Sequence, residues 1–288
     1  LAALEQPMLR QVLLNAILWT AGIEVPARGA EGAGGRVTPD ADRPGASGAV
    51  VASANDATTF HADRQRSGWH RHQPGLTPAR VRDPSFGLLW ESPPLDAYEG
   101  QAPRLYASPL YLSQVRMTTG QHQGQTFQVV FAASNHGHVY AINAARAGDV
   151  AAGRILWHTQ LAPPCHLQPA PLDQVPTGVL STPVIDVTRG RLYVTSCDPK
   201  QRWQAYALDI GSGRIIEGWP VRLDEARFNA VNANAGPSLV PPKRRFDFRV
   251  QRGALNLSPD GARLYVTFGE TETGWLVAVD TLRTRGAS

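Results

Sequence analysis

The sequence has no apolar run long enough to cross a membrane as a helix. Such a helix needs roughly 18 or more consecutive apolar residues, and no stretch of the 288 residues reaches that length. Hydrophobic residues nevertheless make up 42% of the chain, which also contains 27 glycines and 23 prolines. This composition predicts a turn-rich globular protein with its own core and no membrane span.

A long run of basic residues is also missing. The formal net charge is +4 and the isoelectric point is about 9.3, but the basic residues are mostly arginines interleaved with acids. The densest cluster, Lys-Arg-Arg at residues 243–245, is short. Nucleic-acid-binding domains usually gather basic residues on one face, so the sequence predicts no nucleic-acid partner.

Cysteine is scarce, and its spacing fits no metal or haem motif. The two cysteines, Cys165 and Cys197, form neither a CxxC nor a CxxCH pattern. Both fall in loops or at the ends of predicted strands. A disulfide between them, in an exported protein, and two unrelated thiols are equally compatible with the sequence.

Motifs that would indicate catalysis or metal binding are weak or absent. There is no GxSxG motif, and Ser181 is better interpreted as a residue of an inner strand. The pairs His70/His72 and His136/His138 would each place two imidazoles on one side of a strand, as a metal site requires. However, "SNHGH" at residues 134–138 is typical of a hairpin turn. We therefore assign no catalytic residue and no metal ligand.

The chain divides into three parts by composition. Residues 1–27 contain apolar residues at helical spacing and predict one amphipathic helix, which ends near Gly22 and Pro26. Residues 28–58 are dominated by Gly, Ala, Pro, Ser and Asp and predict a flexible linker. Residues 59–288 read as short strands separated by turns, so this part is predicted to be all-β. The predicted strands include residues 86–91 ("FGLLWE") and 214–223 ("RIIEGWPVRL").

Related sequence features recur along the all-β part. Asn143, Asp209 and Asp280 end similar strands ("YAIN", "YALD" and "VAVD") at spacings of 66 and 71 residues. Tryptophans that end a further strand recur at spacings of 67 and 62 residues, at positions 90, 157 and 219. Each unit therefore holds four strands, and four-stranded units repeated around an axis build a β-propeller. Insertions at residues 112–127, 163–177 and 224–249 account for the long period.

One copy of the repeat resembles a known motif. Ala207-x-Asp209-x-x-x-Gly213, followed by Trp219, is similar to the A-x-D-x-x-x-G-x-x-x-W motif of the pyrroloquinoline-quinone (PQQ) repeat in quinoprotein-like propellers. Trp219 comes two residues later than in that motif. The resemblance implies that Trp stacks between blades against a small Ala, that Gly forms a tight turn and that Asp caps it. It assigns these blade-docking roles to Trp90, Ala141, Trp157, Ala207, Asp209, Gly213, Trp219, Ala278 and Asp280.

The expected architecture is therefore a partial β-propeller with about three blades, preceded by one α-helix and a linker. A propeller closes with about 4 to 8 blades, so we expect the missing blades to come from the rest of the parent chain or from another chain. The segment "DRQRSGW" at residues 63–69 resembles the opening of such propellers. There, Asp63, Arg64, Arg66 and Trp69 could form a polar site, but we favour an Arg–Asp pair that holds the chain entry.

The predicted helix of residues 1–27 resembles the closing helix of ThuA-like (trehalose-utilisation) domains, which have an α/β fold. This resemblance implies a truncated ThuA-like domain at residues 1–27, a linker at 28–58 and an incomplete propeller at 59–288. It also implies a connection with carbohydrates. The quinoprotein-like resemblance implies a periplasmic or extracellular location.

Two classes of function follow from the quinoprotein-like resemblance. Enzymes of that family are PQQ-dependent dehydrogenases of alcohols or sugars, which hold PQQ beside Ca²⁺. This sequence has no adjacent cysteine pair and no calcium-ligand set at matching positions. We therefore favour a non-catalytic scaffold that binds a small molecule, a glycan or a protein, with the dehydrogenase as the alternative and a carbohydrate-active or lyase-type propeller enzyme as a third class. The candidate channel-facing residues are Arg104, Tyr106, Ser108, Leu180, Thr182, Arg252 and Asn256.

Overall fold

The computed structural model describes residues 53, 55–63, 65–69, 75–167, 174–223, 250–269 and 274–282. All of them belong to a unit that spans Gly48–Ser288. The predicted helix at residues 1–27, nearly all of the predicted linker, Arg64, the His70/His72 pair and the whole insertion at 224–249 lie outside the described residues.

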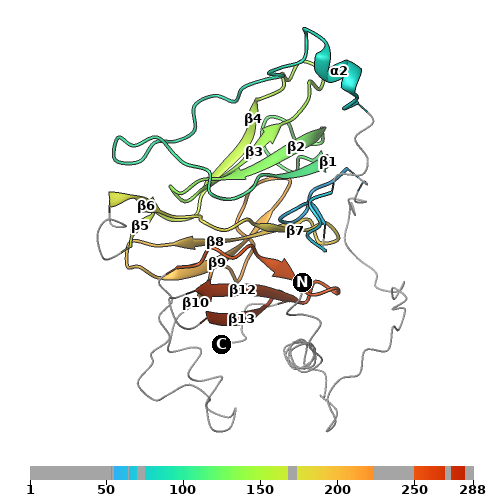
Figure 1. The fold of residues 1–288 in the computed structure, drawn as a ribbon. Coiled ribbons are helices and arrows are strands. Elements are labelled where there is room, and N and C mark those ends of the chain that lie inside the picture. Colours follow the sequence, from blue (N-terminus) through green and yellow to red (C-terminus); the bar gives the residue numbers. More distant parts are fainter. Residues whose placement is uncertain are drawn as a thin grey trace, which may run out of the picture. The chain divides into compact units, whose positions relative to one another are not determined.

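The described part is almost entirely β-structure, which confirms the all-β prediction, and its strands form antiparallel sheets (Figure 1). The first sheet has the order β1-β2-β3-β4 and consists of β1 (Leu110–Arg116), β2 (Thr126–Ala133), β3 (His138–Asn143) and β4 (Ile155–Gln160). The second sheet consists of β7 (Val184–Asp186), β8 (Arg191–Cys197), β9 (Trp203–Asp209) and β10 (Val221–Leu223).

The third sheet has three described strands. These are β11 (Asn256–Leu257), β12 (Arg263–Gly269) and β13 (Gly274–Asp280). A small two-stranded sheet pairs β5 (Cys165–His166) with β6 (Pro176–Thr177). The strand order within each of the first two sheets follows the chain, as expected for consecutive antiparallel hairpins.

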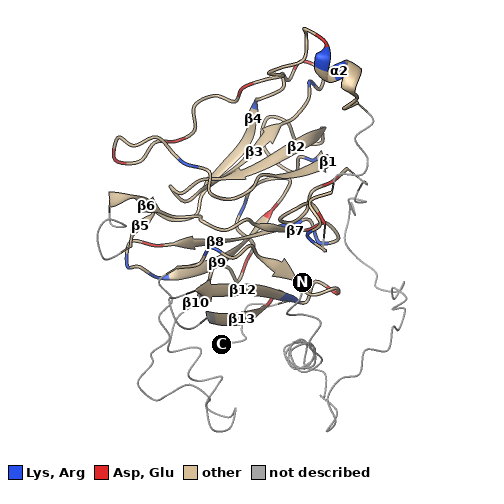
Figure 2. Ribbon diagram, viewed as in Figure 1, with Lys and Arg blue, Asp and Glu red and all other residues tan. Residues whose placement is uncertain are grey.

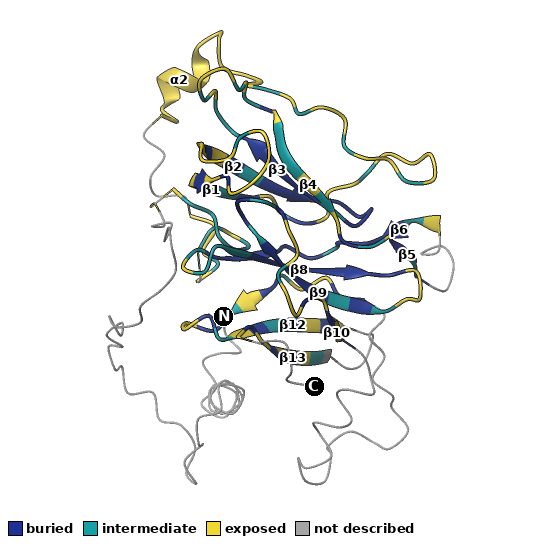
Figure 3. Ribbon diagram, turned by 180° about the vertical axis from the view of Figure 1, so that it is seen from behind, coloured by how far each residue is buried: buried dark blue, intermediate teal, exposed yellow. Residues whose placement is uncertain are grey.

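The three larger sheets stack face to face in chain order (Figure 1). One core lies between the first and second sheets and includes Phe131 and Leu192, and another lies between the second and third and includes Tyr193 and Val266. The second sheet is therefore buried on both faces, so β8 carries a continuous run of buried residues rather than an alternating pattern (Figure 3). Each large apolar side chain buried there contributes about 1.5–3 kcal/mol.

The same cross-strand pair occurs in each of the three sheets. Phe131 faces Ala141 in the first sheet, Tyr193 faces Ala207 in the second, and Tyr265 faces Ala278 in the third. In the first two sheets a tryptophan contacts the aromatic residue of the pair, with ring centroids 5.9 Å apart for Trp157 and 5.4 Å for Trp219. The repeat recognised in the sequence therefore corresponds to a repeated packing arrangement.

Two predicted strands were wrong. Residues 86–97 form no strand, although Trp90 packs against the first sheet beside Tyr140. Pro93 and Pro94 lack the N–H groups that a strand would donate. In the segment 214–223 only Val221–Leu223 is a strand, because Gly218 has a positive φ and Pro220 has no N–H to donate. Trp219 thus precedes the outer strand instead of ending it.

One short helix was not predicted. The helix α2 (Pro78–Arg82) has Thr77 as its N-cap, with the Thr77 hydroxyl accepting a hydrogen bond from the Arg80 N–H, and Pro78 opens the first turn. It buries none of its residues. Within the described ranges no helix has the length and apolar character required to traverse a bilayer. Basic and acidic residues are scattered over the described strands and loops (Figure 2).

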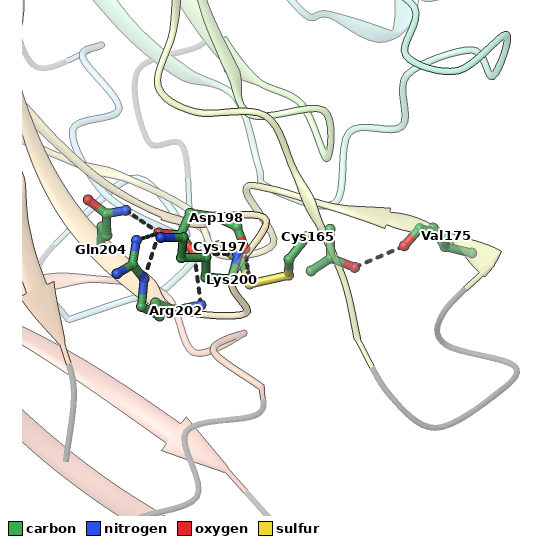
Figure 4. The surroundings of a disulfide bond; sticks show 8 residues. Cys165, Val175, Cys197, Asp198, Lys200, Arg202 and Gln204 are labelled. Atoms are coloured by element: carbon green, nitrogen blue, oxygen red, sulfur yellow. Dashed lines mark hydrogen bonds and ion pairs between the residues drawn. A yellow bond between two sulfur atoms is a disulfide. The ribbon is translucent and has the colours of Figure 1, made fainter.

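Cys165 and Cys197 form a disulfide, which settles the two alternatives left open by the sequence (Figure 4). Their Cα atoms are 5.5 Å apart, and the bond joins β5 to the end of β8. Next to it, the Asp198 carboxylate accepts hydrogen bonds from the Arg202 and Gln204 side chains. Burial alone would raise the pKa of Asp198, but the hydrogen bonds from Arg202 and from backbone N–H groups lower it below its ordinary value.

Candidate ligand-binding surface

The segments that lead into the first strand of each sheet lie side by side. The Ser108 N–H donates to the Thr182 hydroxyl at 3.0 Å, and the Leu255 N–H donates to the Thr182 carbonyl at 3.0 Å. These contacts connect residues 104–109, 180–183 and 250–255, which precede β1, β7 and β11. We call these three segments the first-strand edge.

A buried polar network fixes two of these segments to the second and third sheets. The Thr195 hydroxyl lies 3.0 Å from the Ser181 hydroxyl and donates to Gln251 Oε1 at 2.5 Å. Gln251 Nε2 in turn donates to the carbonyls of Gly253 and Thr267. Burying a polar group without a hydrogen-bond partner costs free energy. This network therefore fixes the position of the backbone of the first-strand edge. Sequence reasoning missed Gln251, since a lone glutamine carries no motif.

Three of the predicted ligand-facing residues form one exposed cluster. Arg104 Nη1 donates to the Tyr106 hydroxyl at 3.3 Å. The guanidinium carbon of Arg252 lies 5.5 Å from the centroid of the Tyr106 ring, which is within the range of a cation–π contact. All three residues are exposed, with Tyr106 at 37%. We call them the Arg–Tyr–Arg cluster.

The backbone under this cluster is held from both sides. The Arg104 N–H donates to the side-chain oxygen of Asn135 at 2.7 Å, and Asn135 is itself buried. Arg66 Nη2 donates to the carbonyls of Ala254 and Leu255 at 3.2 and 3.0 Å. Arg66 therefore anchors its segment to these backbone carbonyls. The predicted Arg–Asp pair is not formed between Arg66 and Asp63, whose carboxylate accepts from Ser67.

The other predicted residues are placed differently. Ser108 and Thr182 are joined by their hydrogen bond, with Ser108 half-buried and Thr182 buried, and Leu180 packs against the core between the second and third sheets. Asn256 is exposed and lines a separate cavity of about 330 Å³. That cavity also contains the Asp186–Arg189 ion pair, with an N–O distance of 2.6 Å.

The surface does not fit the Ca²⁺ that accompanies PQQ in the resemblance. Arg104 and Arg252 supply the exposed charge of the cluster, and two cations repel Ca²⁺. Asp186, the carboxylate in the separate cavity that Asn256 lines, is already paired with Arg189. In the parts of the chain that the structure describes, no group of three or more His, Cys, Asp or Glu side chains could hold a metal ion. We therefore derive no chemical step through either group.

Comparisons with protein-family models, with curated proteins and with solved structures found no significant match to this chain. The quinoprotein-like and ThuA-like resemblances thus stay predictions that rest on the residues quoted for them. The candidate surface is defined by its geometry alone.

Proposed function

We propose that residues 59–288 form part of a propeller-like scaffold that binds a ligand at the first-strand edge without catalysing a reaction. The observation that carries this proposal is the convergence of three segments far apart in the sequence on one surface, where Arg104, Tyr106 and Arg252 are exposed. Binding residues are disproportionately carried by loops that a rigid scaffold positions.

The packing of the sheets supports the propeller-like architecture. Trp90 lies beside Gly153 of the first sheet, and Trp157 lies beside Gly213 of the second, so both contacts join a tryptophan to the turn of the following unit. On the third sheet the equivalent face carries Ala278 and Leu276, and Leu276 is 53% exposed. We propose that a further four-stranded sheet, from the parent protein or a partner, covers this face.

The proposed location is the periplasm or the extracellular space. The Cys165–Cys197 disulfide supports it, because disulfides persist mainly in oxidising compartments. A connection with carbohydrates rests on the ThuA-like resemblance of residues 1–27. Glycans are accordingly among the ligands to be screened, together with other small molecules and proteins.

The test is a binding screen of the chain against mono- and oligosaccharides, organic acids and peptides. The variant Tyr106→Ala removes the centre of the exposed cluster, and Arg146→Gln is the control at an exposed arginine outside the first-strand edge. We expect a ligand whose affinity falls at least tenfold in Tyr106→Ala and is unchanged in Arg146→Gln. A dye-linked dehydrogenase activity that requires added PQQ and Ca²⁺ would overturn the proposal in favour of an enzyme.

A further inference from the structure

The Arg–Tyr–Arg cluster brings two positive charges to a single phenol. Arg104 reaches the hydroxyl and Arg252 reaches the ring, so both guanidinium groups lie within a few ångströms of Tyr106. Two like charges that contact the same side chain repel one another, even at the surface. The tyrosine ring offsets part of this repulsion through its negative face, but it supplies no negative charge.

Two other arginines of the described part are neutralised by a carboxylate. Arg189 pairs with Asp186 and Arg202 pairs with Asp198, each with an N–O distance of 2.6 Å. Among the residues that the structure describes, no carboxylate forms an ion pair with Arg104 or Arg252. Each guanidinium carries five N–H donors, and Arg104 uses one of them on Tyr106.

The backbone that carries these two arginines is ordered before any ligand arrives. Asn135 holds the backbone of Arg104, and Thr182 holds that of Ser108 and Leu255. Gln251, the residue before Arg252, is completely buried in its hydrogen-bond network. A backbone that is already ordered lowers the entropic cost of binding.

We propose that the Arg–Tyr–Arg cluster binds an oxyanion group, a carboxylate, sulfate or phosphate, carried by the ligand of this scaffold. The inference rests on the proposed function, since it names the chemical class of ligand for the same surface. Arginine recognises planar oxyanions through two parallel N–H···O bonds. The Tyr106 hydroxyl accepts from Arg104, so its own proton is available to donate to the same oxyanion.

The charge of the cluster argues for a small ligand with one oxyanion group in contact. A polyanion such as a nucleic acid is bound through many phosphate contacts, whereas two arginines provide a local charge of only two. An uncharged sugar would leave the two guanidinium groups without a counter-charge. The proposed ligand is therefore a small molecule or saccharide that carries a carboxylate, a sulfate ester or a phosphate ester.

Isothermal titration calorimetry of the whole chain at low ionic strength tests this inference. The probes are inorganic sulfate, inorganic phosphate and a galacturonate trisaccharide, with the uncharged galactose trisaccharide as the neutral counterpart of the last. The variants are Arg104→Gln, Arg252→Gln and their double variant, with Arg146→Gln as the matched control. Arg252→Lys keeps the charge and removes the planar fork.

We expect at least one anionic probe to bind, with a loss of about tenfold in affinity for each Arg→Gln change and less than twofold for Arg146→Gln. The probe that binds identifies the source of the oxyanion. The inference is overturned if no anion binds to a chain whose near-ultraviolet circular dichroism shows it folded, or if the double variant binds as tightly as the wild type. If only the neutral trisaccharide binds, and Tyr106→Ala abolishes that binding, the inference of an oxyanion ligand is overturned, whereas the proposed scaffold function is supported.

Discussion

Trp157 lies directly against Gly213 of the following sheet. A Cβ atom at position 213 would come within 2.5 Å of Trp157 Cε3, and the indole N–H donates to the Ile210 carbonyl at 3.0 Å. Gly213 also has a φ of +71°, in the region that L-residues with a side chain rarely adopt. The turn after β9 is therefore shaped by the tryptophan of the sheet before it, which couples neighbouring sheets.

Replacing Gly213 with alanine separates backbone strain from this contact. We expect Gly213→Ala to lower the free energy of unfolding by about 2–4 kcal/mol, because the new methyl group must displace the indole ring and also adopts a strained φ. Gly148→Ala is the matched control, since Gly148 has a φ of +55° and a methyl group there would meet no atom within 4 Å. It should cost only about 1 kcal/mol. Urea denaturation measures both, and equal losses would contradict the coupling of the sheets through Trp157.

The buried network around Thr195 makes a second prediction. Thr195→Val keeps the shape of the side chain and removes the hydroxyl that joins Ser181 to Gln251. Two buried polar groups then lose a partner, so we expect a loss of about 1–3 kcal/mol in the free energy of unfolding. Thr126→Val, at an exposed position of β2, should change it by less than about 0.5 kcal/mol. A loss for Thr195→Val no larger than that control would show that the network contributes nothing to stability.

The repeat was the part of the fold that the sequence could predict. The strands around Ala141, Ala207 and Ala278 lie where their pattern placed them, because each combines β-branched and aromatic residues between turn signals. Residues 86–91 carry the same kind of residues but form no strand. Strand formation depends on a hydrogen-bonding neighbour, and local sequence does not reveal whether one is present.

The candidate surface was predictable as a region but not as a cluster. The sequence predicts Arg104, Tyr106 and Arg252 at the inner, channel-facing strands, whereas the structure places them in the segments that precede β1 and β11. Their mutual contacts depend on how residues 104 and 252, far apart along the chain, are brought together by the stacking of sheets. The Cys165–Cys197 pairing has the same origin, since β5 and β8 belong to different sheets.

The disulfide makes a third prediction. Its two cysteines are separated by 32 residues, and closing a loop of that size in the unfolded chain stabilises a protein by about 3–4 kcal/mol in the chain-entropy description. The double variant Cys165→Ala/Cys197→Ala should therefore unfold at a lower urea concentration than the wild type. Addition of a reductant should destabilise only the wild type. If thiol titration of the denatured wild type without reductant finds two free thiols, the bond does not form.

A short loop segment docks on the first sheet largely through histidines. Within residues 95–101, the Asp96 carboxylate accepts from Tyr140 at 2.9 Å and lies 3.8 and 3.6 Å from the Nδ1 atoms of His138 and His158. Its backbone carbonyl lies 3.1 Å from His136 Nδ1. Burial raises the pKa of Tyr140 to about 12, so its phenol remains a donor to Asp96 throughout the physiological range. The contacts between this segment and the first sheet therefore depend on the protonation state of the histidines.

Acidification should lower the free energy of unfolding through His138. Burial lowers the pKa of His138 below its ordinary value of 6.5, and this outweighs the opposite effect of Asp96, while the neighbouring His158 and His136 lower it further. A group with a lowered pKa in the folded state favours the neutral form there. The contribution of His138 to the free energy of unfolding is thus complete above pH 6.5 and is lost as the pH falls through its lowered pKa.

Urea denaturation between neutral and mildly acidic pH measures this effect. The free energy of unfolding should fall with the pH in the wild type and in the control His122→Gln, whose ring lies on Phe127. In His138→Gln this fall should be smaller, because the titrating group is gone. A fall as large in His138→Gln as in the wild type would contradict this role of His138.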